Sequence, residues 1–384
     1  MLFVEVEKMD NKRIVIYGAG DTANKVAKFA KIHLPKMDVD IRLTTMAGGN
    51  LETNEDVARD IDKLVRDDLT KVVIMALVGS DDILKRVRQV RKDIFLVGFK
   101  TTRNASPNEQ YLEALSLCKK CSCNLVVASD TVTKLNMIVA PEETQYAETK
   151  DREELLTELM KMIFHRTHLT FTRSTVVAGN PVPWESDLVP PSLRKVVNYC
   201  IEKNAYKPFN GVTAGHFACK LDDNTFLTSI RKTNFNFLPE TGLVKIVTDG
   251  PDTVLAYGAK PSVGGQSQRI IFRDHPDVDC IVHFHCPKKI NSKVPTVSQK
   301  EFECGSHECG HNTSRGLAKF GNLYAVYLDN HGPNIVFNKN IDPNEVILFI
   351  EENFDLSQKT GGFVSIRQRI EITNALDDLV RYTS

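Results

Sequence analysis

Two histidines one residue apart stand out in residues 281–285, whose other side chains are apolar. Alternate side chains of a strand project from the same face, so His283 and His285 lie close enough to share one cation. A zinc-type site with an open position for substrate needs a third nitrogen ligand, and His331, just past a strand-like run, is a candidate. Four other side chains compete for that position: Cys304, His307, Cys309 and His311. Two strand histidines can equally be hydrogen-bonded core residues, so the pair alone leaves both interpretations open.

The second half of the chain resembles the class II aldolase/adducin family. Residues 275–287 resemble the segment of that family that ends in its paired zinc histidines, and residues 324–337 resemble the segment with its third histidine. The resemblance implies that Zn²⁺ or another divalent metal is held by His283, His285 and His331. It also implies a metal-dependent aldolase-like lyase, dehydratase or epimerase that acts on a small phosphorylated or carboxylated carbonyl compound. A non-catalytic, adducin-like assembly protein is an alternative within the same resemblance.

The same resemblance implies a pocket for the anionic group of the substrate. Residues 213–216 resemble a threonine–small–glycine–asparagine stretch of the family, with histidine in place of asparagine, and residues 261–262 resemble its proline–serine pair. Short hydroxyls and backbone amides can hold an anion, and a nearby cation strengthens them. Arg231 and Lys232 can equally be solvated surface charges. The residues expected to bind the anion are Gly215, His216, Ser229, Arg231 and Ser262.

One residue of the family pattern is replaced. Where the aldolases have a glutamate that serves as acid and base, this chain has Gly264, and glycine cannot transfer a proton. Polarisation of a carbonyl by a metal survives that replacement, but aldol cleavage also needs a base. Within residues 301–311, Glu308 and His307 are the expected substitutes. A second, local metal site is the alternative for this segment, formed by Cys304, His307, Cys309 and His311.

The first half begins with a glycine-rich turn after an apolar strand. Residues 18–23 fit a glycine-x-glycine-x-x-alanine pattern, in which glycines let the backbone approach a phosphate at a helix start. No acid ends the second predicted strand, residues 40–45, where a ribose-binding carboxylate is expected. The pattern therefore predicts phosphate binding without a standard NAD site.

Residues 12–165 resemble the phosphopantothenate–cysteine ligase family of coenzyme A metabolism. The resembling segments are residues 73–81, 96–101, 125–130 and 136–139. The resemblance implies a site for CTP or ATP, built from Gly18, Gly20, Phe99, Lys119, Lys120, Asp130 and Asn136. The family's loop of asparagine, arginine, two serines, glycine and lysine has no clear counterpart, so we expect a nucleotide-like pocket with a dimerisation or regulatory role. A nucleotide-dependent ligase is an alternative function.

The elements that must position these residues differ between the two halves. Alternating strand-like and helix-like segments predict a Rossmann-like domain with a mostly parallel sheet over residues 1–168. Prolines and glycine predict a linker over residues 169–190. Closely spaced short strands predict a class II aldolase-like α/β/α domain over residues 191–384, with a mixed, largely antiparallel sheet. The expected fold class is α/β in both halves.

Composition excludes several classes of partner. The chain has 384 residues, with 49 basic and 49 acidic side chains, so bulk charge does not favour nucleic-acid binding. No apolar run approaches the ~18 residues of a membrane span. The amino-terminal residues lack a signal-peptide pattern, and nine cysteines, an odd number, favour reduced thiols and the cytoplasm. We expect a small-molecule substrate and a homo-oligomer, as a dimer or tetramer.

Overall fold

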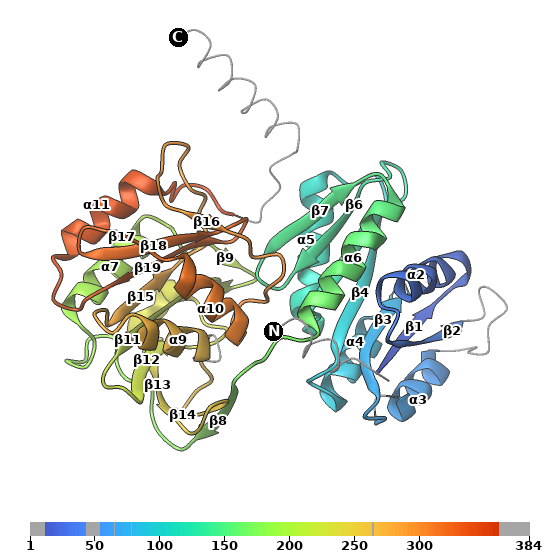
Figure 1. Cartoon of the computed structure of the whole chain (residues 1–384), viewed down its shortest axis with the longest axis horizontal. Helices are drawn as coiled ribbons and strands as arrows, with labels where there is room; N and C mark the ends of the chain where they lie inside the picture. Colours follow the sequence, from blue (N-terminus) through green and yellow to red (C-terminus); the bar gives the residue numbers. More distant parts are fainter. Residues whose placement is uncertain (1–11, 44–53, 65, 78, 263–264, 361–384) are drawn as a thin grey trace, which may run out of the picture.

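The computed structural model describes residues 12–43, 54–64, 66–77, 79–262 and 265–360. Two sheets organise these residues, one of seven strands in the first half and one of ten strands in the second. In Figure 1 the first half lies on the right and the second on the left, joined by the extended segment that leads into β8. The expected α/β fold class is confirmed for both halves.

The first sheet has the order β2-β1-β3-β4-β5-β6-β7, and its first five strands are parallel. The two last strands are antiparallel additions at one edge. The strands are β1 (Arg13–Gly18), β2 (Asp38–Leu43), β3 (Thr70–Ala76), β4 (Phe95–Thr102), β5 (Leu125–Asp130), β6 (Asn136–Ala140) and β7 (Thr144–Thr149). The helices are α2 (Gly20–His33), α3 (Asn54–Leu64), α4 (Asp81–Val90), α5 (Pro107–Cys121) and α6 (Arg152–Arg166).

Helices cover both faces of this sheet. In β1, Ile14 and Ile16 pack into the core beneath α2 and α6, whereas Val15 and Tyr17 pack into the core beneath α3, α4 and α5. A strand that is buried on both faces has apolar residues at successive positions. This is why apolar and polar residues do not alternate in β1. Helix α5 begins at a capping box in which Ser106 and Glu109 bond reciprocally, as expected for a stable helix start.

The second sheet is largely antiparallel, with the order β16-β18-β19-β15-β11-β12-β13-β14-β8, and β17 beside β18. Its strands are β8 (Arg173–Val177), β11 (His216–Lys220), β12 (Thr225–Ser229), β13 (Leu243–Thr248), β14 (Thr253–Tyr257), β15 (Cys280–His283), β16 (Thr296–Val297), β17 (Ala318–Phe320), β18 (Leu323–Leu328) and β19 (Gly332–Phe337). The short strands β9 (Pro208–Phe209) and β10 (Val212–Thr213) pair separately. The helices are α7 (Pro191–Glu202), α8 (Leu238–Thr241), α9 (Gln266–Asp274), α10 (His307–Gly316) and α11 (Pro343–Asn353).

Strand β8 lies inside residues 169–190, the predicted linker, and pairs in parallel with β14. It ends in three β-branched residues and three of its five residues are exposed, which suits an edge strand. The prolines that predicted the linker follow it, between β8 and α7.

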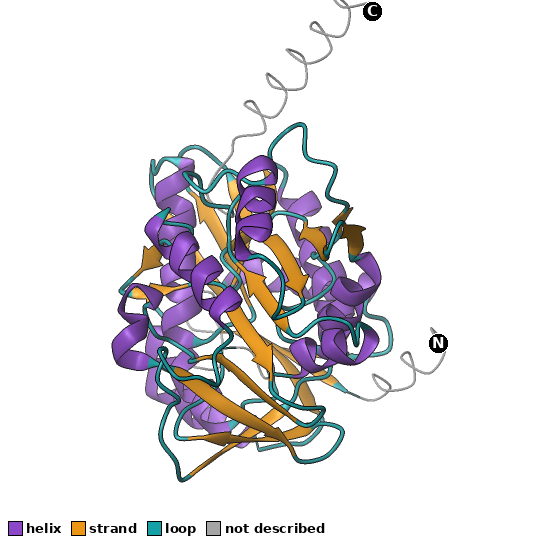
Figure 2. Ribbon diagram, turned by 90° about the vertical axis from the view of Figure 1, so that its left-hand side faces the viewer, coloured by secondary structure: helices purple, strands orange, loops and turns teal. Residues whose placement is uncertain are grey.

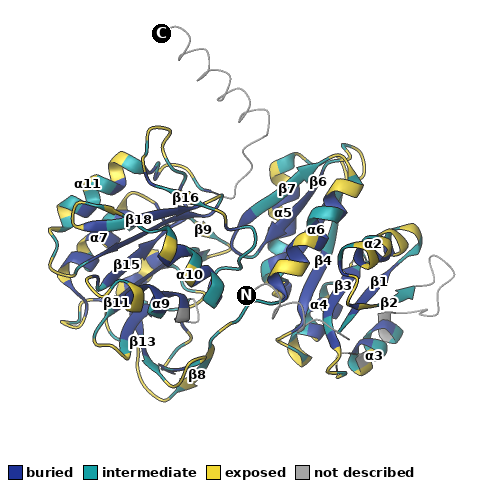
Figure 3. Cartoon of the chain, viewed as in Figure 1, coloured by how far each residue is buried: buried dark blue, intermediate teal, exposed yellow. Residues whose placement is uncertain are grey.

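Helices α7 and α11 cover one face of the second sheet, and α9 and α10 cover the other. Side chains of β15 alternate between these layers, since Val282 packs beneath α7 and α11 while Ile281 packs beneath α9. His283 therefore projects towards α9 and α10. Figure 2 shows the strands between flanking helices, and Figure 3 shows β15, β18 and β11 as a buried centre with exposed residues outside.

Among the described residues, no helix has the length and apolar character needed to cross a membrane.

Candidate metal centre

The three predicted histidines converge. Their ring centroids are 4.4 Å apart for His285 and His331, 4.7 Å for His283 and His331, and 5.0 Å for His283 and His285. One nitrogen of each lies within 4.8 Å of the others, and all three side chains are buried. Among the described residues this is the one group with such spacing, so the alternative local site of Cys304, His307, Cys309 and His311 is not assembled.

A tight turn between β18 and β19 points His331 back at the pair. Asn330 adopts a positive φ of 55°, and the amide of His331 donates to the carbonyl of Leu328 at 3.0 Å. A Cβ at Gly332 would lie closer than 3.0 Å to the carbonyl oxygen of Phe284. Only glycine therefore lets β19 pass so close to the chain that carries His285.

Three ring nitrogens of His283 and His331 are buried without a hydrogen-bond partner. His283 donates from Nδ1 to the carbonyl of Pro333 at 2.7 Å, which leaves Nε2 with its lone pair. That Nε2 atom and both nitrogens of His331 are buried without a hydrogen-bond partner. An unpaired buried polar group costs about 1–3 kcal/mol, and a cation would satisfy it. Three neutral imidazoles, one oriented by a carbonyl, fit a zinc-type cation with an open coordination position.

A fourth imidazole, His216, stacks beside His283 with ring centroids 4.8 Å apart. Gln268 of α9 lies 2.9 Å from its Nδ1 atom. A Cβ at Gly215 would be 2.6 Å from the carbonyl oxygen of His283, so glycine permits this approach. The structure thus brings two residues predicted for anion binding, Gly215 and His216, to the histidine cluster.

Burial keeps these imidazoles neutral. It lowers the pKa of His283 and of His331 to about 3, and the positive charge of a neighbouring histidine acts in the same direction. Burial also lowers the pKa of His216 and His285 well below the usual value. Neutral histidine is the form that binds a metal.

This burial predicts a pH-dependent stability for the metal-free protein. An unfolded histidine has a pKa near 6.5, so below that pH the unfolded chain takes up protons that the folded chain does not. We expect the free energy of unfolding to fall as the pH drops from about 6.5, by up to about 1.4 kcal/mol per pH unit for each histidine. Urea denaturation at several pH values checks this, and His331→Gln should flatten the slope. A slope unchanged by His331→Gln would contradict it.

Residues predicted to bind the anion lie at a separate cavity of about 300 Å³. Its polar lining includes Arg231, Lys260 and Ser262. Ser229 is buried behind the lining, and its hydroxyl lies 2.7 Å from that of Ser262. Sequence reasoning missed Lys260, although it directly precedes the proline–serine pair. It also missed Thr172, just before β8, and Ser174 of β8, which line the cavity too, because they lay in the predicted linker.

A second, enclosed cavity of about 10 Å³ lies at the histidine cluster. It is lined by His216, His283 and His331, and on the opposite side by Cys304, Gly305 and Cys309. This space is about that of one water molecule or ion and is too small for a substrate. Because Cys304 and Gly305 line both cavities, they form a wall between the histidines and the larger cavity.

Two thiols stand in or beside this wall. Cys309 is in the first turn of α10, and Gln299 donates to its sulfur at 3.4 Å. A hydrogen bond with Cys304 lowers the pKa of Cys309 and raises that of Cys304.

The predicted acid/base residues Glu308 and His307 lie elsewhere. The Glu308 carboxylate accepts a hydrogen bond from the amide of Thr170 at 2.9 Å, and the His307 ring lies 3.0 Å from the hydroxyl of Thr172. Neither residue lines either cavity. Both fasten the start of α10 to the segment before β8. Gly264 lies outside the described residues.

The residues of the first half that were predicted to bind a nucleotide do not lie together in one site. Gly18 and Gly20 lie where β1 meets α2, and Gly20 has a φ of 50°. Asp130 ends β5 at the same carboxyl edge, but four backbone amides and the Thr102 hydroxyl already bond its carboxylate. Burial acts to raise the pKa of Asp130, yet these donors hold it well below the usual value. Asn136 bonds the Ser129 hydroxyl, and Phe99 packs in the core beneath α2 and α6.

The two predicted phosphate lysines lie at the opposite edge. Helix α5 ends where β5 begins, so Lys119 and Lys120 are at the amino edge of the sheet, away from Gly18. Lys119 pairs with Glu143 between β6 and β7, and Lys120 pairs with Asp81 at 2.8 Å. The prediction overlooked that a helix crossing between parallel strands returns to the opposite edge.

Comparison with known proteins identifies part of the chain. Residues 195–342 match the model of the Class II Aldolase and Adducin N-terminal domain. The resemblance stated from the histidine-bearing segments is thereby confirmed, and the matched span contains all three histidines. No curated protein sequence matches the chain.

Several solved structures are similar to parts of this chain. L-fuculose 1-phosphate aldolase is 16% identical, covering 42% of this chain and 82% of that chain, with a TM-score of 0.32. YgbL from Escherichia coli is 19% identical over 43% of this chain and 84% of that chain, with a TM-score of 0.32. A DNA/pantothenate metabolism flavoprotein from Streptococcus pneumoniae is 16% identical over 40% of this chain and 99% of that chain, with a TM-score of 0.33.

Proposed function

We propose that the chain is a divalent-metal enzyme of the class II aldolase type, acting on a small phosphorylated or carboxylated carbonyl compound. The observation that carries the proposal is the convergence of His283, His285 and His331, with buried nitrogens that lack partners. These three residues would hold Zn²⁺ or a related cation. When bound there, the cation would polarise a carbonyl oxygen of the substrate.

The cavity beside the histidines supplies the rest of the substrate site. Arg231 and Lys260 offer two positive charges, and Ser262 offers a hydroxyl, which together suit a phosphate or carboxylate. Besides Lys260 and the proposed metal ligands, four residues lining the two cavities have side chains able to exchange a proton: His216, Glu303, Cys304 and Cys309. One of them would take the role of the acid and base that Gly264 cannot perform. The reaction is a carbon–carbon cleavage, a dehydration or an epimerisation. Cleavage begins with proton removal from the hydroxyl β to the carbonyl, whereas dehydration, epimerisation and the reverse of cleavage begin with removal of a proton beside the carbonyl.

Proton exchange tests this proposal without the natural substrate. Zinc-loaded protein is incubated in D₂O with a panel of small phosphorylated or carboxylated aldehydes and ketones, and loss of the proton beside the carbonyl is followed by NMR. We expect exchange with at least one compound, its loss in metal-free protein, and a loss of at least about tenfold in kcat/KM for Arg231→Met. The surface variant Lys319→Met serves as control. Exchange that is absent with every compound would favour the non-catalytic, adducin-like alternative.

Three further expectations stay proposals. The first half would bind a nucleotide at the turn formed by Gly18 and Gly20, and the ligase alternative depends on that binding. The chain would form a homo-oligomer. It would act in the cytoplasm.

A further inference from the structure

A loop of the second half that contacts the first half lines the histidine cavity. Residues 298–306, here named the strap, run from the end of β16 to the start of α10. The strap carries Cys304 and Gly305, which line both the enclosed cavity and the 300 Å³ cavity. These two residues of the strap therefore stand between the larger cavity and the histidines.

The first half holds the strap through one buried arginine at the end of α6. Arg166 donates from Nε to the carbonyl of Lys300 at 3.1 Å and from Nη2 to the carbonyl of Phe302 at 3.4 Å. Its guanidinium also pairs with Glu142 at 2.7 Å and lies 5.0 Å from the ring of Tyr146. The side chains of Arg166 and Glu142 are 0% and 1% exposed, so this ion pair is fully withdrawn from water.

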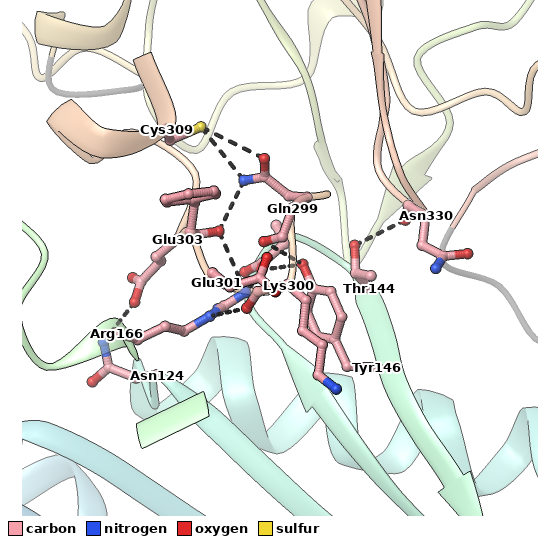
Figure 4. A network of polar contacts seen from close by, with 12 residues as sticks. Asn124, Thr144, Tyr146, Arg166, Gln299, Lys300, Glu301, Glu303, Cys309 and Asn330 are labelled. Atoms are coloured by element: carbon pink, nitrogen blue, oxygen red, sulfur yellow. Dashed lines mark hydrogen bonds and ion pairs between the residues drawn. The ribbon is translucent and has the colours of Figure 1, made fainter. Parts of the chain in front are cut away.

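Weaker contacts surround this arginine (Figure 4). The Tyr146 hydroxyl donates to Glu142 at 2.8 Å and lies 3.5 Å from the carbonyl of Gln299. Asn124 donates to Glu303 at 2.9 Å, and Lys300 pairs with Glu158. The contacts to Gln299, Glu303 and Lys300 join strap residues to the first half.

Hydrogen bonds of a strap residue connect the part of the strap held by Arg166 to the lining of the cavity. Gln299 is fully buried and donates to the carbonyl of Phe302 at 2.9 Å and to the sulfur of Cys309 at 3.4 Å. Cys309 lines the enclosed cavity together with His283 and His331. An unbroken series of contacts therefore runs from Arg166 through Gln299 to the lining of the candidate metal centre.

The turn that carries Glu142 also reaches the histidines from the other side. The Thr144 hydroxyl donates to the carbonyl of Asn330 at 3.0 Å, and Asn330 directly precedes His331. The β6–β7 turn of the first half thus touches both the His331 turn and, through Arg166, the strap.

We propose that Arg166 is a positioning residue of the candidate metal centre, by which the first half holds the strap closed over the histidine cavity. The inference rests on the proposed metal site. A buried ion pair is seldom a net source of stability, whereas a guanidinium that joins two carbonyls and a carboxylate defines one position of a loop. Release of the strap would join the two cavities into one substrate site.

The test measures access to the cavity in the full-length protein. Co²⁺-loaded protein is mixed with excess EDTA, and the loss of the cobalt absorption is timed. In parallel, alkylation of Cys304 and Cys309 by iodoacetamide is timed by mass spectrometry. For Arg166→Met we expect both rates to rise by about ten- to a hundredfold, with the cobalt spectrum before EDTA unchanged. Arg166→Lys should fall between, because an ammonium cannot bridge the same three acceptors.

Arg194→Met is the matched control. Arg194 likewise donates to two main-chain carbonyls, those of Ser186 and Val189, and pairs with Glu185, but it does not touch the strap. Its loss should leave both rates unchanged. If Arg166→Met does not fold, Tyr146→Phe removes only the hydroxyl contacts and should raise both rates in the same direction by a smaller factor.

The outcomes separate this inference from the proposed function. A folded Arg166→Met protein whose cobalt release and alkylation rates match those of Arg194→Met would overturn the role of Arg166. Wild-type protein that binds no Co²⁺ would overturn the metal site, and the alkylation rates would still decide whether Arg166 holds the strap.

Discussion

Replacing His331 with alanine should weaken Zn²⁺ and Co²⁺ binding more than about 100-fold. Changes in residues that merely orient metal ligands cost about 10–100-fold in affinity, so loss of a ligand should exceed that range. His331 is 1% exposed, and both its nitrogens lack hydrogen-bond partners. Removing it leaves His283 and His285, which cannot complete a three-nitrogen site. Competition with a chromophoric chelator measures the dissociation constant.

His311→Ala is the matched control for this change. His311 is exposed on α10, and the sequence offered it as one of four alternatives to His331 as the third metal ligand. Its removal should leave metal affinity unchanged. Wild-type affinity in His331→Ala, or a loss in His311→Ala of the same size, would assign the metal to other ligands.

Replacing Gly332 with alanine should lower the free energy of unfolding by about 3 kcal/mol or more. A Cβ at this position would lie closer than 3.0 Å to the carbonyl oxygen of Phe284, and the φ of 154° is one that side chains rarely adopt. The backbone of β19 must therefore move away from the segment that carries His285. This displacement should separate His331 from His285 and weaken metal binding.

Gly211→Ala provides the comparison for backbone strain alone. Gly211 has a φ of 78°, and an added Cβ there would meet open space. It should cost about 1 kcal/mol in the free energy of unfolding and leave metal affinity unchanged. Urea denaturation of both variants measures the difference. Equal destabilisation by the two substitutions would show that the close approach of Gly332 to Phe284 does not matter.

Sequence reasoning found the metal centre because its ligands lie at or just beyond the ends of strands, with His283 at the end of β15, His285 two residues later and His331 in the turn before β19. His283 and His285 follow from strand alternation, and family resemblance supplied His331. The regular alternation of strands and helices in the first half likewise predicted its parallel sheet. Local periodicity and motif order were sufficient for these features.

The remaining features depend on contacts between distant segments. Arg166 meets the strap across more than 130 positions of sequence, and no local pattern marks an arginine whose partners are main-chain carbonyls. Glu308 was chosen because its type suits acid–base chemistry, yet its position on α10 directs it to the amide of Thr170. Residue type alone does not tell which way a helix start faces.

X-ray absorption of the zinc-loaded wild-type protein tests the central claim most directly. The account predicts one tightly bound zinc per chain, with three imidazole nitrogens at about 2.0–2.1 Å and no sulfur ligand. Protein that retains no zinc, or a spectrum dominated by sulfur at about 2.3 Å, would contradict the assignment to His283, His285 and His331.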